Sequence, residues 1–462
     1  MFGTKPRGDQ HQLSKTGMSP AKVLAFGFFS IILTGAVLLM LPISNKSGRW
    51  LGFLEALFTA TSATCVTGLT VVDTFGTFTI FGQIITLCLI QVGGLGFMLF
   101  ATMALVAVGR RISLRNRMLL RETMSMPGLS GGVRTTIRFM WIALSIEMLG
   151  TILLSLRFIP MYGAGKGFYF GLYHAISAFC NAGFDLFGTA GSLQIFHQDP
   201  LVLLTVSSLI ILGGIGFTVI ADCSDHARHP RYLSLHSKIV LSTTGVLLLT
   251  GFILVALVEW DNVQTLARPG AYAGEKLMNA WFQSVTTRTA GFFSFDQGKM
   301  NDATKFVSSV LMFIGASPAS TGGGIKTSTL FVVIMVLGSI IAGRNETNAF
   351  GKRMSSTIGR TAQSILFMYL TLIVAGALFL TIAERDAGFS FLDLLFEEAS
   401  ALGTVGLSAL GTPNLHTPSR LLLIVFMYLG RVGPLTIMLT LNHPATSGAG
   451  TIRFPEERII VG

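Results

Sequence analysis

A glycine recurs four times along the chain, each time just after an apolar segment that is too short to cross a membrane. The four residues are Gly68, Gly183, Gly291 and Gly406, separated by 115, 108 and 115 residues. A unit of this size, repeated four times in one chain, can place four equivalent backbone loops around one axis. Rings of backbone carbonyls can replace the hydration shell of a cation. The spacing therefore predicts a cation pore.

The composition places the chain in a membrane. Of its 462 residues, 51% are apolar and 12% are charged, and the mean hydropathy is +0.66. A helix needs about 20 apolar residues to cross a hydrocarbon layer of about 30 Å. The sixth of eight candidate spans is too long for one regular helix and is interrupted. The predicted spans are 22–41, 78–108, 136–157, 200–220, 238–258, 304–343, 359–383 and 418–441.

The net charge of +11 follows from membrane topology. With eight spans both termini lie on one side, and 20 of the 33 Lys and Arg residues lie on that side. The positive-inside rule then predicts that the terminal segments 1–21 and 442–462 are cytoplasmic. Anionic lipid headgroups are the expected counter-charge, so no nucleic-acid partner is predicted.

Each glycine belongs to a repeat made of a span, a short apolar segment, a polar loop and a second span. The short segments are 12–14 residues long, which indicates re-entrant helices. Non-helical backbone beyond them must line water or be buried in protein. We therefore expect an all-α polytopic membrane protein with four covalently linked repeats, eight spans and four re-entrant pore loops around one pore. The predicted repeats are 22–121, 134–222, 236–345 and 358–441, and the short segments are Leu51–Ala63, Phe168–Phe179, Tyr272–Val285 and Phe389–Leu402.

A second set of glycines recurs in phase within the second spans. Taken singly, such glycines indicate ordinary small-residue helix packing. Their recurrence in every repeat, together with the loop glycines, favours the fourfold repeat. They are Gly93, Gly213, Gly315 and Gly430.

The residues around each loop glycine are predicted to form a selectivity filter. Glycine adopts positive φ freely, and a missing Cβ lets four segments approach one axis. The carboxyl ends of the short helices would add partial negative charge near a cation. The predicted filter residues are Cys65, Val66, Thr67, Gly68, Leu69, Cys180, Asn181, Ala182, Gly183, Phe184, Arg288, Thr289, Ala290, Gly291, Phe292, Gly403, Thr404, Val405, Gly406 and Leu407.

Three acidic residues follow the loop glycines closely. Asp73, Asp185 and Asp296 could form an outer acidic vestibule that concentrates cations. They could equally be solvated loop acids, and the sequence leaves both interpretations open.

The sixth span contains a proline and three successive glycines, which do not hold a regular helix. Two half-helices joined by a polar loop at 315–329 are predicted, with the loop on the cytoplasmic side of the filter, where it could act as a gate. A phosphate-binding loop is rejected because Ile325 stands where that motif requires glycine. Lys326 could serve the loop or snorkel towards the cytoplasm, and snorkelling is favoured. The predicted gate residues are Gly315, Ser317, Pro318, Ser320, Thr321, Gly322, Gly323, Gly324, Lys326 and Arg431.

Arg431 lies inside the last span, where an arginine costs at least about 2.5–3.5 kcal/mol. Below a cation filter it would repel the permeant ion, less strongly if loop carbonyls bind its guanidinium. The alternative is that Arg431 has a packing role, in which its guanidinium pairs with backbone or with Glu397 or Glu398. Arg288 is expected to point away from the axis and to pair with a carboxylate such as Glu55 or Glu398. A buried network of these acids behind the filter is predicted.

The four loops resemble the filters of the Trk/Ktr/HKT superfamily of potassium transporters. The motifs are Cys-Val-Thr-Gly-Leu-Thr at 65–70, Cys-Asn-Ala-Gly-Phe-Asp at 180–185, Thr-Arg-Thr-Ala-Gly-Phe at 287–292 and Leu-Gly-Thr-Val-Gly-Leu-Ser at 402–408. The likeness runs from about residue 20 to about 441 and is greatest for the Ktr-type membrane subunit. It implies potassium uptake across the bacterial plasma membrane, a gating loop, and an arginine at the position of Arg431. Serine in the first filter of such proteins goes with sodium permeation, so Gly68 indicates potassium.

The resemblance also implies ligands and partners. K+ is expected at the carbonyls of Val66, Thr67, Asn181, Ala182, Thr289, Ala290, Thr404 and Val405. Sodium is a candidate activator, and no cofactor is expected in this chain. A homodimer is implied, with a cytosolic RCK-type regulatory ring of the KtrA/TrkA kind that binds nucleotide. The basic loops 109–121 and 343–360 are its candidate docking surfaces.

A secondary transporter and a membrane enzyme are the two alternatives to a pore. A secondary transporter of a small solute would suit the broken sixth span, but its inverted repeats would not give four loops in parallel orientation. A membrane enzyme would need a catalytic or metal-binding cluster, and the histidines are scattered along the chain. The sequence therefore predicts a non-enzymatic, channel-like subunit, with the secondary transporter as the alternative.

Overall fold

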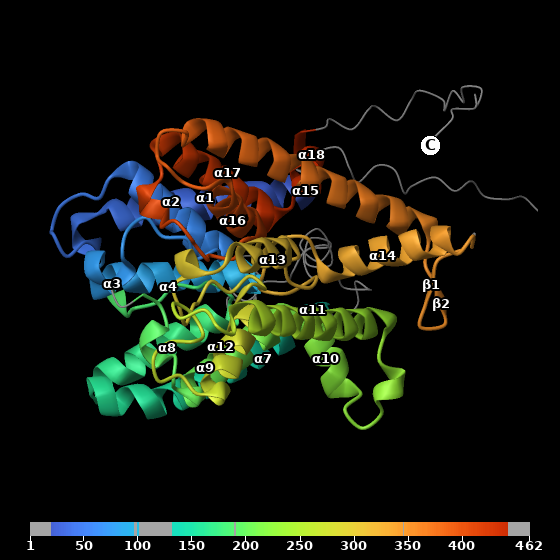
Figure 1. Cartoon of the computed structure of the whole chain (residues 1–462), viewed down its shortest axis with the longest axis horizontal. Helices are drawn as coiled ribbons and strands as arrows, with labels where there is room; N and C mark the ends of the chain where they lie inside the picture. Colours follow the sequence, from blue (N-terminus) through green and yellow to red (C-terminus); the bar gives the residue numbers. More distant parts are fainter. Residues whose placement is uncertain (1–19, 97–98, 101–131, 189–190, 345, 442–462) are drawn as a thin grey trace, which may run out of the picture.

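The computed structural model describes residues 20–96, 99–100, 132–188, 191–344 and 346–441. These residues form a helical bundle in which segments from the two ends of the chain lie together (Figure 1). Four helices are long and apolar enough to cross a membrane, and the bent pair α9–α10 would make a fifth. The four long helices are α1 (Pro20–Met40), α7 (Gly132–Tyr162), α11 (Leu235–Glu259) and α15 (Ser356–Ala383).

Each long helix is followed by a short helix that leads into one of the glycine loops. The short helices are α2 (Phe53–Cys65), α8 (Ala164–Phe179), α12 (Ala273–Thr286) and α16 (Phe391–Gly403). Their carboxyl-terminal halves are buried, as expected for helices enclosed by the bundle.

A second helix follows each glycine loop. Shorter helices, a hairpin and several 3-10 turns connect these main helices. The second helices are α4 (Ile80–Leu95), α9 (Pro200–Ile215), α13 (Asp302–Phe313) and α17 (Thr417–Val432). Beyond them come α10 (Phe217–Asp225), α14 (Thr327–Ile341) and α18 (Pro434–Leu441), and a hairpin of β1 (Asn348–Ala349) and β2 (Lys352–Arg353) connects α14 to α15. The remaining elements are α3 (Thr74–Thr77), η1 (Pro42–Ser44), η3 (Gln194–Phe196), η4 (Pro230–Tyr232), η5 (Gln297–Lys299) and η6 (Thr412–Asn414).

The end of each long helix is tied to the start of the second helix in the same repeat. Glu259 accepts a hydrogen bond from the Asn301 amide, and Glu384 accepts one from the His416 amide, both at 2.8 Å. Arg157 forms an ion pair with Asp199, which also caps the first turn of α9. In the first repeat the Thr79 amide donates to the Ser44 carbonyl at 2.9 Å. These bonds satisfy the unpaired amides at the start of the second helices.

The second helix breaks in all four repeats, whereas the sequence predicted a break only in the sixth span. The breaks fall at Gly96, Gly216 and Gly433, with φ between +86° and +101° and ψ between 128° and 140°. At Gly216 the helix bends by 94°, so the predicted span 200–220 consists of two helices that meet at an angle. The predicted spans 78–108 and 418–441 likewise are not single helices, and part of the first falls outside the described residues. Only glycine adopts this backbone conformation without steric cost.

The glycines that precede these breaks let the short helices pack directly on the second helices. A Cβ at Gly93 or Gly213 would lie 1.9 Å from the carbonyl oxygen of Thr64 or Phe179, and one at Gly430 would lie 2.1 Å from that of Leu402. Each of these carbonyls comes four residues before a loop glycine. The second set of repeated glycines therefore allows the close packing that positions three of the glycine loops against the second helices.

An aromatic cluster supports the second loop. The Phe158 side chain is fully buried, and its ring lies 5.3–5.8 Å from those of His174, Phe187 and Phe196. The His174 Nε2 accepts a hydrogen bond from the Leu186 amide at 3.2 Å, three residues beyond Gly183. Phe158 thus joins α7, α8 and the segment after the loop.

Replacing Phe158 by alanine should destabilise the fold by about 3 kcal/mol, because it removes a fully enclosed ring and leaves a cavity. The measurement is the melting temperature of the purified protein in detergent. Phe367→Ala is the matched control, since that side chain is 72% exposed. Equal melting temperatures for the two variants would contradict the role assigned to the cluster.

Candidate functional site

The four glycine loops share an unusual backbone conformation. The loop glycines have φ between +68° and +98°. The residue two positions earlier also has a positive φ in every repeat, between +52° and +65°, although none of these residues is glycine. They are Val66, Asn181, Thr289 and Thr404. Non-glycine residues in this region cost about 1–2 kcal/mol each, so their surroundings must hold them there.

The four loops form a closed ring. A Cβ at Gly68 would lie 2.5 Å from the carbonyl oxygen of Ala182, and one at Gly183 would lie 2.7 Å from that of Ala290. In the same way, a Cβ at Gly291 would lie 2.5 Å from the carbonyl oxygen of Val405. A Cβ at Gly406 would lie 2.2 Å from that of Thr67, which closes the ring. The carbonyl that precedes each glycine therefore faces the next glycine around the ring. Backbone oxygens of this kind are suited to binding a dehydrated cation.

Hydrogen bonds from the short helices hold the loops in this conformation. The Ser62 and Ser400 hydroxyls each accept a bond from the amide of the loop glycine six residues later, at 3.0 Å. The hydroxyls of Ser177 and Thr286 instead donate to the carbonyls of Phe184 and Phe292. The side chain that follows each glycine is buried in the protein. These side chains belong to Leu69, Phe184, Phe292 and Leu407.

The first, second and fourth loops leave their helices in the same way. The amides of Thr67, Ala182 and Val405 donate to the carbonyls of Ser62, Ser177 and Ser400 at 2.7–2.8 Å. This bond from the residue after the left-handed position closes the helix end. In the third repeat the Ala290 amide donates to the Thr286 carbonyl instead. The third loop therefore differs from the other three.

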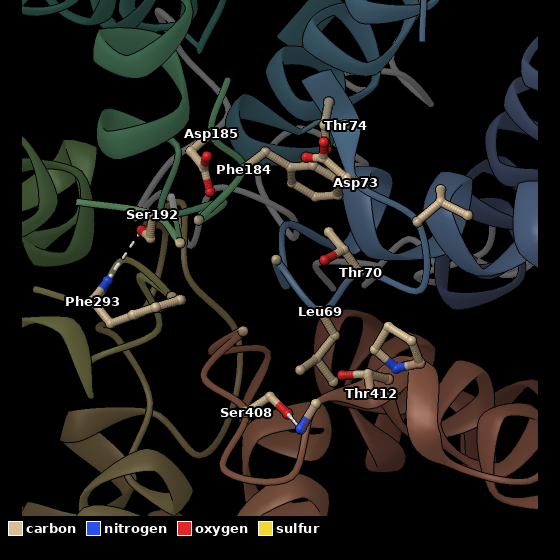
Figure 2. Close-up of a pocket in the computed structure, with 18 of the residues that line it drawn as sticks. Leu69, Thr70, Asp73, Thr74, Phe184, Asp185, Ser192, Phe293, Ser408 and Thr412 are labelled. Carbon is tan, nitrogen blue, oxygen red and sulfur yellow. Dashed lines mark hydrogen bonds between the residues drawn. The ribbon is translucent and has the colours of Figure 1, made fainter. Parts of the chain in front are cut away.

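A cavity of about 320 Å³ opens above the ring. Its lining includes all four loop glycines, and Figure 2 shows side chains from four separate segments around it. Asp73 and Asp185 line this cavity, but Asp296 is not among its lining residues. Asp73 and Asp296 accept hydrogen bonds from Gly76 and Gly298 and so cap short helices. The three acids therefore do not form one vestibule, and Asp296 fits the alternative of a loop acid.

The charge of Asp185 is weakened by its surroundings. Removal from water raises the pKa of this carboxyl to about 7, the Phe187 amide opposes the rise, and the Asp73 carboxylate adds to it. A carboxyl with this pKa is only partly ionised near neutral pH.

The segment between α13 and α14 lies against the other side of the ring. The Gly323 amide donates to the Thr404 hydroxyl at 3.1 Å, and the Thr321 hydroxyl donates to the Phe179 carbonyl at 3.1 Å. A Cβ at Gly322 would lie 2.1 Å from the Thr289 hydroxyl oxygen. The loop therefore contacts three of the four filter segments or the helices that carry them.

Further hydrogen bonds fix this loop to the breaks in the second helices. The Ser317 amide donates to the Gly214 carbonyl at 3.0 Å, and the Phe217 amide donates to the Ala319 carbonyl at 2.9 Å. Within the loop, the Ser320 hydroxyl donates to the Ser317 carbonyl at 2.6 Å. The break at Gly216 thus provides both room and partners for the segment that contains Pro318.

Arg431 connects the loop to the first repeat. Its guanidinium donates to the carbonyl of Thr321 in the loop and to the carbonyls of Gly93 and Gly94, the last at 3.1 Å. Binding to backbone carbonyls fits both a softened barrier and the alternative of a packing role paired with backbone. Its described hydrogen bonds go to backbone carbonyls, and no ion pair joins it to Glu397 or Glu398.

Two other cations have partners that differ from those predicted. The Lys326 ammonium donates to the Gly322 carbonyl at 2.8 Å, so it braces the loop and does not snorkel. The Arg288 guanidinium donates to the Gly315 carbonyl at 3.4 Å, and it has no ion pair with a described residue. The predicted pairing of Arg288 with Glu55 or Glu398 was therefore wrong.

The acids behind the filter do not form one network. Glu397 accepts a hydrogen bond from the Thr412 hydroxyl at 2.5 Å, whereas neither carboxylate oxygen of Glu398 has a partner among the described residues. Glu147 was not predicted as a site residue, and its two carboxylate oxygens accept bonds from the Gln91 side-chain amide at 3.0 and 2.9 Å. The signal was available, since both residues lie within predicted spans. No group of three or more metal-binding side chains occurs among the described residues.

Comparisons with known proteins agree with this architecture. Residues 14–448 match the family model of TrkH, described as a cation transport protein. The chain is 41% identical to the Ktr system potassium uptake protein B of Bacillus subtilis, over 96% of this chain and 97% of that protein. It is 38% identical to the potassium/sodium uptake protein NtpJ of Enterococcus hirae, over 96% and 98% of the two chains.

A solved structure has the same fold. The potassium transporter TrkH from Vibrio parahaemolyticus aligns with a TM-score of 0.70 and 18% identity, over 94% of this chain and 87% of that one. The family model and the relatives span almost the whole chain. This protein therefore belongs to the TrkH family of cation transport proteins.

Proposed function

We propose that this chain is the ion-translocating subunit of a Ktr/Trk-type potassium-uptake system in the bacterial plasma membrane. In this proposal the four repeats contribute eight spans and four re-entrant loops, and both termini are cytoplasmic. The relatives named as potassium uptake proteins cover nearly the whole chain, which supports the assignment of the substrate. The chain has no proposed catalytic role, and K+ is its cargo.

The observation that carries the proposal is the closed ring of carbonyls. The carbonyl before each loop glycine faces the next glycine, and the residue before that carbonyl has the same left-handed backbone in all four repeats. A ring of this kind can exchange the hydration shell of K+ for backbone oxygens. The proposed ligands are the carbonyls of Val66, Thr67, Asn181, Ala182, Thr289, Ala290, Thr404 and Val405.

The loop between α13 and α14 is the proposed gate. It lies against filter residues on the side opposite the cavity, and Arg431 binds its Thr321 carbonyl. A guanidinium close to the exit of a cation pore raises the energy of an ion passing it. In the proposal, opening moves the loop away from the ring and releases Arg431.

A secondary transporter of a small solute is the alternative. The broken segment between α13 and α14 has the form of the midplane breaks in such carriers. The four loops, however, have the same hand and close one ring, which favours a pore.

Partners are also part of the proposal. A dimer of pore subunits is proposed, with a cytosolic ring of RCK-type subunits of the KtrA/TrkA kind that carries the nucleotide. The relatives named as parts of a Ktr system support the existence of a partner. The candidate docking loop 343–360 includes the β1–β2 hairpin, while 109–121 lies outside the described residues. Sodium remains a candidate activator, and the name of the Enterococcus hirae relative includes both ions.

Substituting Gly68 by serine should weaken discrimination between potassium and sodium. The new Cβ would meet the Ala182 carbonyl at 2.5 Å, and φ of +95° disfavours a side chain by about 1–2 kcal/mol, or roughly tenfold in an equilibrium. The measurement is potassium-dependent growth and sodium uptake in a bacterial strain that lacks its own uptake systems.

Gly48→Ser is the matched control for this substitution. Gly48 also has a positive φ, of +64°, but a Cβ there would meet nothing within 4 Å. Rescue that is indifferent to Gly68→Ser would displace the filter assignment while leaving transport intact. If the chain alone does not rescue growth, the assay is repeated with a Ktr-type cytosolic partner, and failure there would favour the carrier alternative.

Replacing Arg431 by alanine should raise the potassium uptake rate several-fold at equal expression. The substitution removes a positive charge from the pore exit and frees the Thr321 carbonyl of the loop. Arg385→Ala is the control, because Arg385 lies beyond the end of α15, is exposed and pairs with the neighbouring Asp386. An unchanged potassium uptake rate in Arg431→Ala would contradict the barrier role.

A further inference from the structure

A second cavity lies far from the ring, between the ends of α14 and α15 that approach the β1–β2 hairpin (Figure 1). Its volume is about 200 Å³. The lining combines apolar side chains with hydroxyls, one amide and two guanidinium groups. Six of the lining residues carry the inference, namely Val332, Val336, Arg344, Ser355, Arg360 and Gln363.

Both arginines in the lining are without a counter-charge in the part of the chain that the structure describes. Among the described residues, neither Arg344 nor Arg360 has an ion pair or a side-chain hydrogen bond. The nearby Arg353, which is not in the lining, does pair with Glu346 at 2.9 Å. Two unpaired guanidinium groups at one cavity are suited to an anion, since arginine binds phosphate through paired donors.

The backbone around the cavity also favours an anion. Helix α15 has 28 residues and begins at Ser356, so the positive end of its dipole lies at the cavity. At the opposing end of α14, three of the last carbonyls are already occupied, because the amides of Ala342, Gly343 and Arg344 donate to them at 2.9–3.0 Å.

The rest of the cavity is apolar and continues into the exposed surface of the bundle. Val332 and Val336 form one side, and Gly359 allows α15 to approach α14, since a Cβ there would lie 3.1 Å from the Val336 side chain. Leu337 and Ile341 on α14 are 57% and 79% exposed nearby. A charged end beside an apolar surface at a membrane boundary fits a lipid and does not fit a free ion as well.

We propose that this cavity binds the phosphate of an anionic membrane lipid, held between Arg344 and Arg360 with its acyl chains along α14 and α15. Basic pockets between helices on the cytoplasmic side are known to bind such headgroups. Helix α14 begins at Thr327, directly after the loop that contacts the ring. A bound lipid thus holds the far end of the helix from which the loop extends.

The test measures lipid retained by the purified full-length chain. Native mass spectrometry compares retention of phosphatidylglycerol and phosphatidylcholine for the unaltered chain and for the double variant Arg344→Gln with Arg360→Gln. Each arginine near an anionic headgroup contributes about 1 kcal/mol, so the double variant should retain phosphatidylglycerol about 30-fold less well, with phosphatidylcholine unaffected.

The control is the double variant Lys352→Gln with Arg353→Gln, which removes the same charge from the adjacent hairpin, outside the cavity lining. It should retain phosphatidylglycerol as the unaltered chain does. An equal loss in both double variants would reduce the effect to general surface charge and overturn the proposal. Equal retention of the two lipids by the unaltered chain would also overturn it.

A third arm separates a lipid from a free anion. Inorganic phosphate alone is added to the lipid-depleted chain, and the melting temperature is compared with that after addition of phosphatidylglycerol. Stabilisation by the lipid but not by phosphate supports the proposal, and equal stabilisation would assign the cavity to free phosphate. Both arginines are exposed, so the glutamine variants should fold, and their melting temperatures without lipid check this. None of these measurements depends on transport.

Discussion

The carbonyl ring governs the rest of the structure, because backbone that is not helical has no hydrogen-bond partners in lipid. Four loops must be enclosed by protein on all sides and still expose their carbonyls to a shared axis. A Cβ on any of the four loop glycines would come within 2.2–2.7 Å of a neighbouring carbonyl oxygen. The ring can therefore close only where the side chain is absent in all four repeats.

The structure around the ring provides hydrogen-bond partners for backbone amides and carbonyls that have no partner within the ring. Serine hydroxyls at the same position of α2 and α16 accept the amides of the loop glycines. Gly93, Gly213 and Gly430 let the preceding helices approach closely enough for this register. On the other side, Arg431 and Lys326 donate to carbonyls of the broken segments. Cations placed in the membrane thus serve as hydrogen-bond donors for irregular backbone.

The features that occur in all four repeats could be predicted because the same residue pattern recurs in the sequence. The loop glycines, the short helices and the interruption between α13 and α14 each follow from a residue pattern that recurs or departs plainly from a helix. The positive φ of Val66 or Thr404 could not be predicted, since those side chains normally disfavour it and only the closed helix end holds them there. The partners of Arg288 and Lys326 also escaped prediction, because each binds a backbone carbonyl, which leaves no trace in side-chain composition.

The third repeat differs from the others in how its glycine loop leaves the short helix and in the segment that follows its second helix. This difference places the loop between α13 and α14 beside the ring. In the other repeats the first glycine of the second helix meets a carbonyl of the preceding short helix, whereas Gly315 meets the carbonyl of Gly323. The Ile314 and Ile325 backbones pair in a single parallel bridge, which closes the loop at its two ends. Arg288 fills the space behind with a bond to Gly315. A ring of four similar loops therefore rests on a segment from one repeat. A movement of that segment would change access to the ring by breaking its bonds to Gly214, Thr404 and Arg431 of the second and fourth repeats.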